Sequence, residues 1–142
     1  MKILLTLLLM LSLSDASKLD KFASDFNYSR DYSSALKTAK KQDKLIMLVL
    51  VSRSCPWCEE FEKNTLSSSF IGAKVDASLV PLIMNNTLDA SRYPKKFYSK
   101  QVPSIAFINP KTQTVVYETL GYMNKKTFSQ EIDIALEKYA KK

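Results

Sequence analysis

The two cysteines of the chain stand close together, in the stretch Cys55-Pro56-Trp57-Cys58. They follow an apolar run over residues 45–51, and the residues after them have the spacing and charge of a helix. An apolar run this short, bounded by polar residues, is typical of a strand that is buried on both faces. We therefore expect the cysteines to lie where a buried strand leads into a helix.

That position favours the thiolate form of Cys55. The N–H groups of a first helical turn lack intrahelical partners, and together with the helix dipole they stabilise negative charge. Pro56 suits the first helical position because it has no N–H to leave unpaired, and Arg53 adds a positive charge nearby. Such effects lower the thiol pKa in C-x-x-C motifs. We expect Cys55 to be the exposed attacking thiol and Cys58, one turn deeper, to be the buried resolving thiol.

Two other interpretations of the cysteine pair are weaker. A zinc site normally needs four nitrogen or sulfur ligands, and this sequence offers two thiols and no histidine. A purely structural disulfide between residues this close would form a loop too short to stabilise the fold much. The sequence therefore favours a redox-active dithiol, with no metal and no other cofactor.

The first sixteen residues have the pattern of a secretory signal peptide. Lys2 precedes an apolar run over residues 3–13, and two small residues, Ser14 and Ala16, stand just before an expected cleavage site after Ala16. The apolar run is too short for a permanent membrane anchor. We therefore expect an exported mature domain over residues 17–142 without a membrane anchor. Its terminus lacks a Lys-Asp-Glu-Leu-like retention signal, so we expect a periplasmic location, with secretion as the alternative.

The composition restricts the class of partner. The net charge is +7, but the lysines are scattered singly and in pairs rather than in a stripe interleaved with aromatic residues. We therefore do not expect nucleic-acid binding. Two cysteines in an exported protein are too few for a disulfide-stapled scaffold. In an oxidising compartment the pair is either oxidised or kept reduced by a dedicated donor, so the redox partner decides the function.

Periodicity and turn chemistry predict the other elements. We expect helices over 33–42, about 55–66 and 125–140, a short irregular helix over 88–98, and a further helical turn over 71–77. Strands are expected over 45–51, 79–84, 105–108 and 114–118, and residues 17–31 should form a lead-in with one amphipathic turn. Ser33 or Ser34 should cap the first helix and Asn124 the last. A strand, crossover helix and strand predict parallel pairing, to which the last two strands add an antiparallel hairpin.

With this element order, the chain resembles the thioredoxin fold, and within it the C-terminal periplasmic domain of DsbD and its exported thioredoxin-like relatives. The likeness rests on Cys55 to Thr65, which reads Cys-x-x-Cys-x-Glu-Phe-Glu-Lys-x-Thr, and on residues 121–128. The resemblance implies an α/β fold with a mixed sheet of about four strands flanked by helices. It also implies that Pro103 is a cis-proline packed against the cysteines and that the backbone of Val102 pairs with a substrate strand.

The resemblance also assigns supporting residues and shows departures. Glu62 matches an acidic residue near the cysteines of the DsbD-like domain and is four residues after Cys58, so a buried carboxylate there could exchange protons with Cys58. A solvated glutamate is the alternative. Val49 replaces the aspartate that these relatives place six residues before the first cysteine, and Ser54 replaces their usual tryptophan. We expect Trp57 to be an exposed apolar contact for substrate.

We therefore expect a monomeric thiol-disulfide oxidoreductase that reduces protein disulfides with electrons from a membrane donor. An oxidase or isomerase that uses a membrane acceptor is the first alternative. Pro56, Val102 and the missing carboxylate favour it, although an isomerase would usually add a dimerisation domain. A non-enzymatic thioredoxin-like binder or chaperone is the second alternative.

Overall fold

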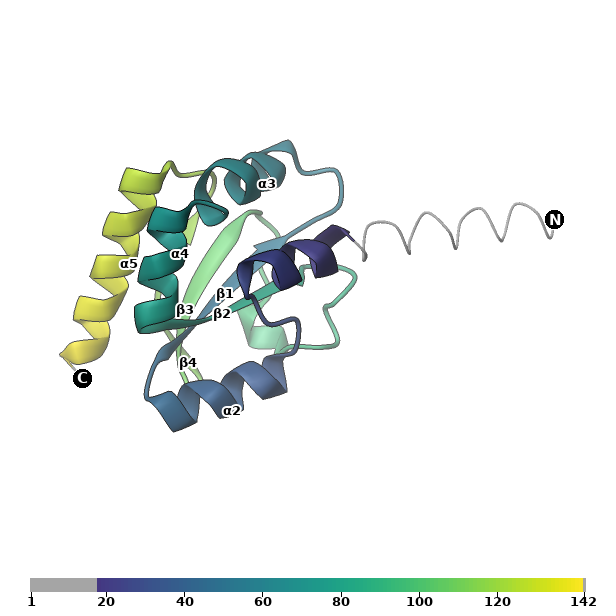
Figure 1. The fold of residues 1–142 in the computed structure, drawn as a ribbon. Helices are drawn as coiled ribbons and strands as arrows, with labels where there is room; N and C mark the ends of the chain where they lie inside the picture. The colour runs from purple at the N-terminus through teal and green to yellow at the C-terminus, as the bar shows by residue number, and fades with distance from the viewer. Residues whose placement is uncertain (1–17, 142) are drawn as a thin grey trace.

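A mixed sheet of four strands forms the centre of the computed structural model, which describes residues 18–141 (Figure 1). The signal peptide predicted over residues 1–16 lies outside the described residues. In the order β2-β1-β3-β4, β1 (Leu45–Val51) pairs parallel with β2 (Leu79–Asn85) and antiparallel with β3 (Ser104–Asn109). β3 pairs antiparallel with β4 (Thr114–Leu120). The predicted thioredoxin-like fold with a four-strand mixed sheet is confirmed.

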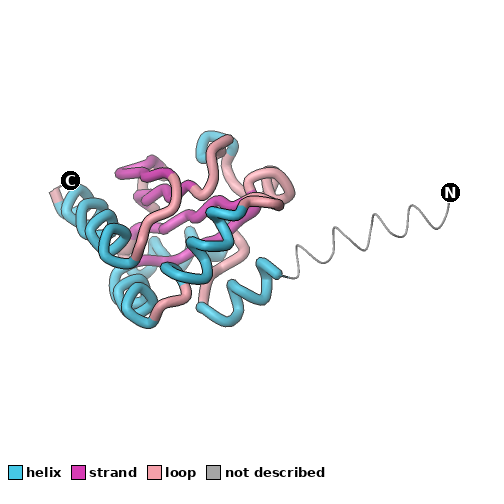
Figure 2. The backbone as a smooth tube through the Cα atoms, turned by 90° about the horizontal axis from the view of Figure 1, so that it is seen from above, coloured by secondary structure: helices cyan, strands magenta, loops and turns pink. Residues whose placement is uncertain are grey.

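Strand β1 is buried along its whole length because helices and loops pack on both faces of the sheet. Its alternate side chains enter two separate cores. Met47 and Val49 pack with residues of the helices that follow the cysteines, such as Phe61, whereas Leu48 packs with residues such as Ala35 from the helix before β1. Figure 2 shows the strands in magenta with the cyan helices around them.

One face of the sheet is covered by α2 (Tyr32–Gln42) and by the segment after β2. The other face is covered by α3 (Pro56–Phe61), a π-helical turn η1 (Glu62–Leu66), α4 (Ser69–Ser78) and α5 (Lys125–Ala140). Helices α4 and α5 lie side by side in Figure 1, and Lys74 on α4 donates hydrogen bonds to Ser129 on α5. No helix within residues 18–141 is long and apolar enough to cross a membrane.

The chain before α2 differs from the prediction of a single amphipathic turn. Residues 18–26 form a helix, and its Leu19 and Ala23 side chains are buried in the core. Ser29 then lies alongside β2, where its N–H donates to Pro81 and its carbonyl accepts from Ile83. Phe22 also packs against this core, and Leu19, Phe22, Ala23 and Phe26 have the spacing of one helix face, so the sequence carried a signal for a longer helix than the one turn predicted.

Two further local predictions are wrong. The N-cap of α2 is Asp31, whose carboxylate accepts the N–H of Ser34, and is neither Ser33 nor Ser34. Residues 88–98 form turns and one 3₁₀ turn, η2 (Lys95–Phe97), in place of the predicted short helix.

The side chains around residues 88–98 explain why no helix forms there. The carboxylate of Asp89 accepts the backbone N–H of Asn85, and the hydroxyl of Tyr93 donates to the carbonyl of Asn86. These side-chain hydrogen bonds compete with the backbone ladder of a helix.

Candidate active site

Cys55 and Cys58 form a disulfide at the N-terminus of α3. Cys55 is the N-cap residue, and its Sγ accepts the backbone N–H of Cys58 at 3.2 Å. Pro56 occupies the first helical turn. Cys55 is half-buried, whereas Cys58 is only 1% exposed. The Cys55 sulfur is therefore the one of the pair that an incoming molecule can reach.

Helix α3 continues into the π-helical turn η1, which connects the cysteines to the loop before α5. The N–H of Glu62 donates to the carbonyls of Cys58 and Glu59, so the backbone after the cysteines is still helical at this residue. Within η1, the buried Thr65 hydroxyl donates to the carbonyl of Met123 at 2.6 Å. The π-helical turn was not predicted, and such turns are often found at functional sites.

A shallow hollow lies beside the disulfide, lined by Trp57, Val102, Pro103, Gly121 and Tyr122. The peptide bond between Val102 and Pro103 is cis. The carbonyl oxygen of Val102 is 3.9 Å from the Sγ of Cys55. Trp57 is 62% exposed, so its ring is available for contact with another molecule. The structure thus brings Trp57, Val102 and Pro103 together next to Cys55.

Tyr122 is a wall of this hollow that sequence reasoning did not single out. Gly121 has a φ of 85°, which favours glycine, and its N–H donates to the carbonyl of Pro103. The ring of Tyr122 then lies 5.6 Å from the ring of Trp57 and 6.4 Å from that of Phe61. The aromatic residue directly after a glycine was the available signal, within a stretch that already resembled the DsbD-like domain.

A second pocket lies behind the disulfide-bearing turn. It is lined by residues 51–54, by Glu59 and Glu62, by the N-terminal helix, and by the end of β2 with the turn that follows it. Its charged side chains are Lys18, Arg30, Arg53, Glu59, Glu62 and Asp89. Burial, together with the negative charge of Glu59, raises the pKa of Glu62 to about 7. The side chain of Glu62 is half-buried at the edge of this pocket.

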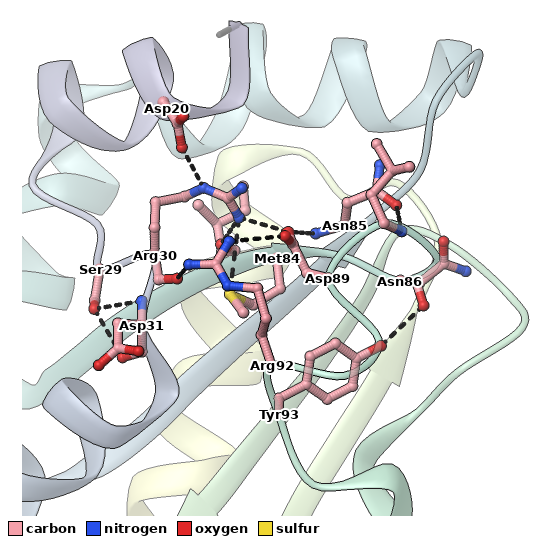
Figure 3. A network of polar contacts seen from close by, with 12 residues as sticks. Asp20, Ser29, Arg30, Asp31, Met84, Asn85, Asn86, Asp89, Arg92 and Tyr93 are labelled. Atoms are coloured by element: carbon pink, nitrogen blue, oxygen red, sulfur yellow. Dashed lines mark hydrogen bonds and ion pairs between the residues drawn. The ribbon is translucent and has the colours of Figure 1, made fainter. Parts of the chain in front are cut away.

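A network of ion pairs, centred on the buried pair of Arg30 and Asp89, lies at one wall of this rear pocket (Figure 3). The guanidinium of Arg30 donates to Asp89 at 2.8 Å, to Asp20 at 2.8 Å and to the carbonyl of Ile83. Arg92 donates to the second carboxylate oxygen of Asp89 at 2.9 Å. Burial alone would raise the pKa of Asp89, but the hydrogen bonds from Arg30 and Asn85 outweigh it and lower that pKa. The network joins the N-terminal segment to the end of β2, and sequence reasoning missed it.

Val49 and Ser54 are the two positions at which the sequence departs from the thioredoxin pattern. Val49 is fully buried in β1 among apolar side chains, so no carboxylate lies at that position. Ser54 is exposed in the turn before Cys55 and has a φ of 55°. Within residues 18–141, no cluster of three or more histidine, cysteine or acidic side chains could hold a metal ion.

Comparisons with known proteins agree with this geometry. Residues 32–136 match the thioredoxin-like domain family. A thioredoxin from Thermus thermophilus is 20% identical, with a TM-score of 0.65 over 75% of this chain and 85% of that chain. The DsbH oxidoreductase is 17% identical, with a TM-score of 0.62 over 78% and 87%.

The oxidised C-terminal domain of DsbD from Neisseria meningitidis is also 17% identical, with a TM-score of 0.59 over 72% of this chain and 90% of that chain. No curated protein sequence matches this chain. At such identities the solved structures show a common fold, while the family match rests on the sequence itself. The chain belongs to the thioredoxin-like domain family and carries a Cys55–Cys58 disulfide in its C-x-x-C motif.

Proposed function

We propose that the protein is an exported thiol-disulfide oxidoreductase that reduces protein disulfides in a periplasm. One observation carries the proposal: two cysteines joined at a helix N-terminus differ sharply in exposure. The half-buried Cys55 sulfur accepts a helical N–H and contacts Val102, which lines an open hollow, while Cys58 is buried. A structural disulfide would not need an accessible sulfur next to an unfilled hollow.

In the first step, the thiolate of Cys55 in the reduced protein attacks one sulfur of a substrate disulfide. A mixed disulfide forms, the substrate S–S bond breaks, and the other substrate sulfur leaves as a thiolate that takes a proton from water. The N–H of Cys58 faces the Cys55 sulfur and stabilises its negative charge. The backbone of Val102 is close enough to Cys55 to pair with an extended substrate strand.

In the second step, Cys58 loses its proton and its sulfur attacks the sulfur of Cys55. The mixed disulfide breaks, the Cys55–Cys58 disulfide forms, and the second substrate sulfur leaves as a thiolate. The substrate has gained two electrons and the protein has lost two. Glu62 is the proposed proton acceptor, because it follows Cys58 by one helical turn and a base with a pKa of about 7 is well matched to neutral pH.

Another turnover requires a new pair of electrons. We propose that a membrane protein supplies them, that the protein acts as a monomer, and that it needs no bound cofactor because the two thiols carry the electrons. The motif from Cys55 to Thr65, similar to that of the DsbD-like domain, supports the reducing direction. Export is supported by the pattern of residues 1–16, and recovery of a mature protein that starts at Ser17 would test it. A protein that keeps Met1 in cells would contradict export.

The reduction potential of the Cys55–Cys58 pair tests the direction. It can be titrated against glutathione and followed by the fluorescence of Trp57, the single tryptophan of the chain. A value near that of thioredoxin, about −270 mV, is expected for a reductant. A value near that of DsbA, about −120 mV, would overturn the reducing direction and make the protein a disulfide donor. Retention of the biological role after replacement of both cysteines by serine would instead indicate a non-enzymatic binder.

A further inference from the structure

A groove lies on the face of β3 and β4 that is turned away from α5. It runs between residues 96–101 and β4, and its lining includes Tyr98, Lys100, Ala106, Val115, Glu118 and Leu120. The segment that leads into this lining, residues 88–98, forms turns and the single turn η2. Unlike the rear pocket, the groove is not needed for the two steps of disulfide exchange.

The groove exposes large apolar side chains and adjoins the hollow beside the disulfide. Tyr98 and Leu120 are each 50% exposed, and Val115 is 38% exposed. Two segments of the chain pass from the groove to the hollow. Leu120 of the groove is two residues before Tyr122 of the hollow, and residue 101 of the groove directly precedes Val102 of the hollow. From Val115 to Leu120 the strand extends about 17 Å, at about 3.4 Å per residue. Exposed apolar patches of this kind, bordered by polar residues, mark protein interaction sites.

The border of the groove is basic. Lys95, Lys96 and Lys100 are exposed, and no carboxylate within residues 18–141 forms an ion pair with any of them. Glu118 is the acidic side chain of the lining. A second copy of this chain, with its net charge of +7, would be repelled. A partner with carboxylates around an apolar surface would instead be attracted.

We propose that the β3–β4 groove is the docking surface for an acidic protein that exchanges disulfides with Cys55 and Cys58. This inference rests on the proposed function, because it names the class of protein partner for the same redox site. The partner covers Leu120 and Tyr98 with apolar side chains and places carboxylates near Lys96 and Lys100. Its reacting sulfur then reaches Cys55 through the adjoining hollow.

The test compares three substrates of the reduced protein at low ionic strength. The first is α-lactalbumin, which is an acidic protein with a readily reduced disulfide. The second is pancreatic trypsin inhibitor, which is a basic protein with an exposed disulfide. The third is 2-hydroxyethyl disulfide, which is uncharged. We expect the double variant Lys96→Glu/Lys100→Glu to react at least about fivefold more slowly with α-lactalbumin, because charges at the rim of an interface govern association. Its rate with 2-hydroxyethyl disulfide should not change, and its rate with the basic protein should rise.

Matched controls separate the groove from general effects of charge and hydrophobicity. Lys37→Glu/Lys40→Glu makes the same change in net charge on the exposed side of α2 and should leave all three rates nearly unchanged. Leu120→Thr should slow the reaction with α-lactalbumin about threefold through the loss of apolar contact. Phe70→Ser, at an exposed position on α4, should not.

Each outcome has a definite meaning. No reaction of the wild-type protein with 2-hydroxyethyl disulfide would overturn the proposed function, and the docking partner with it. A normal reaction with that reagent, but an unchanged α-lactalbumin rate in Lys96→Glu/Lys100→Glu, would overturn the docking surface alone. An equal loss in the α2 control would also overturn it. A wild-type dimer that Leu120→Thr dissociates would show that a second copy covers the groove.

Discussion

The hollow beside the disulfide and the pocket behind it share helix α3 but differ in chemistry. The hollow is made of the aromatic rings of Trp57 and Tyr122 and the backbone around Val102. The rear pocket is made of charged side chains, among them Glu62 and Asp89. Aromatic rings and an adjacent backbone segment suit the recognition of a polypeptide, whereas a half-buried carboxylate suits proton transfer. We propose that the hollow contacts the substrate and that the rear pocket takes up the proton.

This division has a physical reason. In the proposed reaction, a protein substrate approaches from solvent and covers the hollow, so water there is displaced. A proton that leaves Cys58 at that moment needs a route that the substrate does not block. Glu62 lines the rear pocket, and no residue that lines this pocket also lines the hollow. Substitutions on the two sides should therefore change different measured quantities.

The largest effect on stability is expected for Asp89→Asn, which removes the charge at the centre of the rear network. Asp89 is 7% exposed and its partner Arg30 is 16% exposed, so the substitution removes the buried ion pair and leaves the guanidinium of Arg30 with only the exposed Asp20 as an acidic partner. We expect a loss of about 3 kcal/mol in the free energy of unfolding, measured by urea denaturation. Glu137→Gln, in an exposed pair with Lys141, should cost less than about 0.5 kcal/mol and serves as the control. Equal effects would show that the network does not hold this wall of the pocket.

Glu62→Gln should slow the attack of Cys58 on the mixed disulfide by about tenfold at neutral pH, because it removes the proton acceptor. The wild-type rate should rise with pH through about 7 as Glu62 ionises, and the variant should lose this inflection. Stopped-flow measurement of the second step at several pH values would show both. An unchanged pH profile in the variant would show that water, rather than Glu62, accepts the proton of Cys58.

The same variant has a separate signature in stability. In the folded protein, the pKa of Glu62 is raised from 4.5 to about 7, so the folded state binds this proton more tightly than the unfolded state. The contribution of Glu62 to the free energy of unfolding is therefore largest below about pH 4.5 and is lost as the pH rises through 7. Glu62→Gln should be more stable than the wild type at pH 8, with a smaller difference at pH 5. Urea denaturation at the two pH values checks this result.

Trp57→Ala should weaken recognition without changing the sulfur chemistry. The exposed ring forms one wall of the hollow and contacts Tyr122, so its loss removes apolar area that a substrate would cover. We expect the KM for α-lactalbumin to rise about fivefold, with little change in kcat or in the rate with 2-hydroxyethyl disulfide. Phe70→Ala is the matched control. A fall in kcat alone would move Trp57 from recognition to catalysis.

The smallest effect is expected for Asp31→Ala, which lies outside both the hollow and the rear pocket. It removes the N-cap hydrogen bond of α2 and should cost about 1 kcal/mol in the free energy of unfolding. Neither KM nor the pH profile should change. A change in KM or in the pH profile would show that the site responds to any loss of stability. The separate roles proposed for the hollow and the rear pocket would then lose their support.

Features with a strong local signal could be predicted from the sequence. The bounds of β1 and α5 were predicted correctly because a bounded apolar run and a helix capped by Asn124 are local patterns. The place of Cys55 and Cys58 at the start of a helix followed from the same logic. The parallel pairing of β1 and β2 followed from the crossover between them.

Features that depend on distant contacts could not be predicted. The position of the N-terminal helix depends on contacts of Leu19, Phe22 and Ala23 with the core, although the helical spacing of these residues was a local signal for the helix itself. The absence of a helix over residues 88–98 depends on side-chain hydrogen bonds of Asp89 and Tyr93. The π-helical turn shifts the helical register without any compositional signal, and the contact of Tyr122 with Trp57 joins residues far apart in the sequence.

The most direct test of the central claim is the trapping of reaction intermediates. After reduction, Cys58→Ser and Cys55→Ser would each be mixed with α-lactalbumin, and products would be analysed by non-reducing electrophoresis and mass spectrometry. We predict that Cys58→Ser accumulates a mixed disulfide through Cys55, because the resolving thiol is missing, and that Cys55→Ser does not. Equal trapping by both variants, or trapping by Cys55→Ser alone, would contradict the assignment of Cys55 as the attacking thiol.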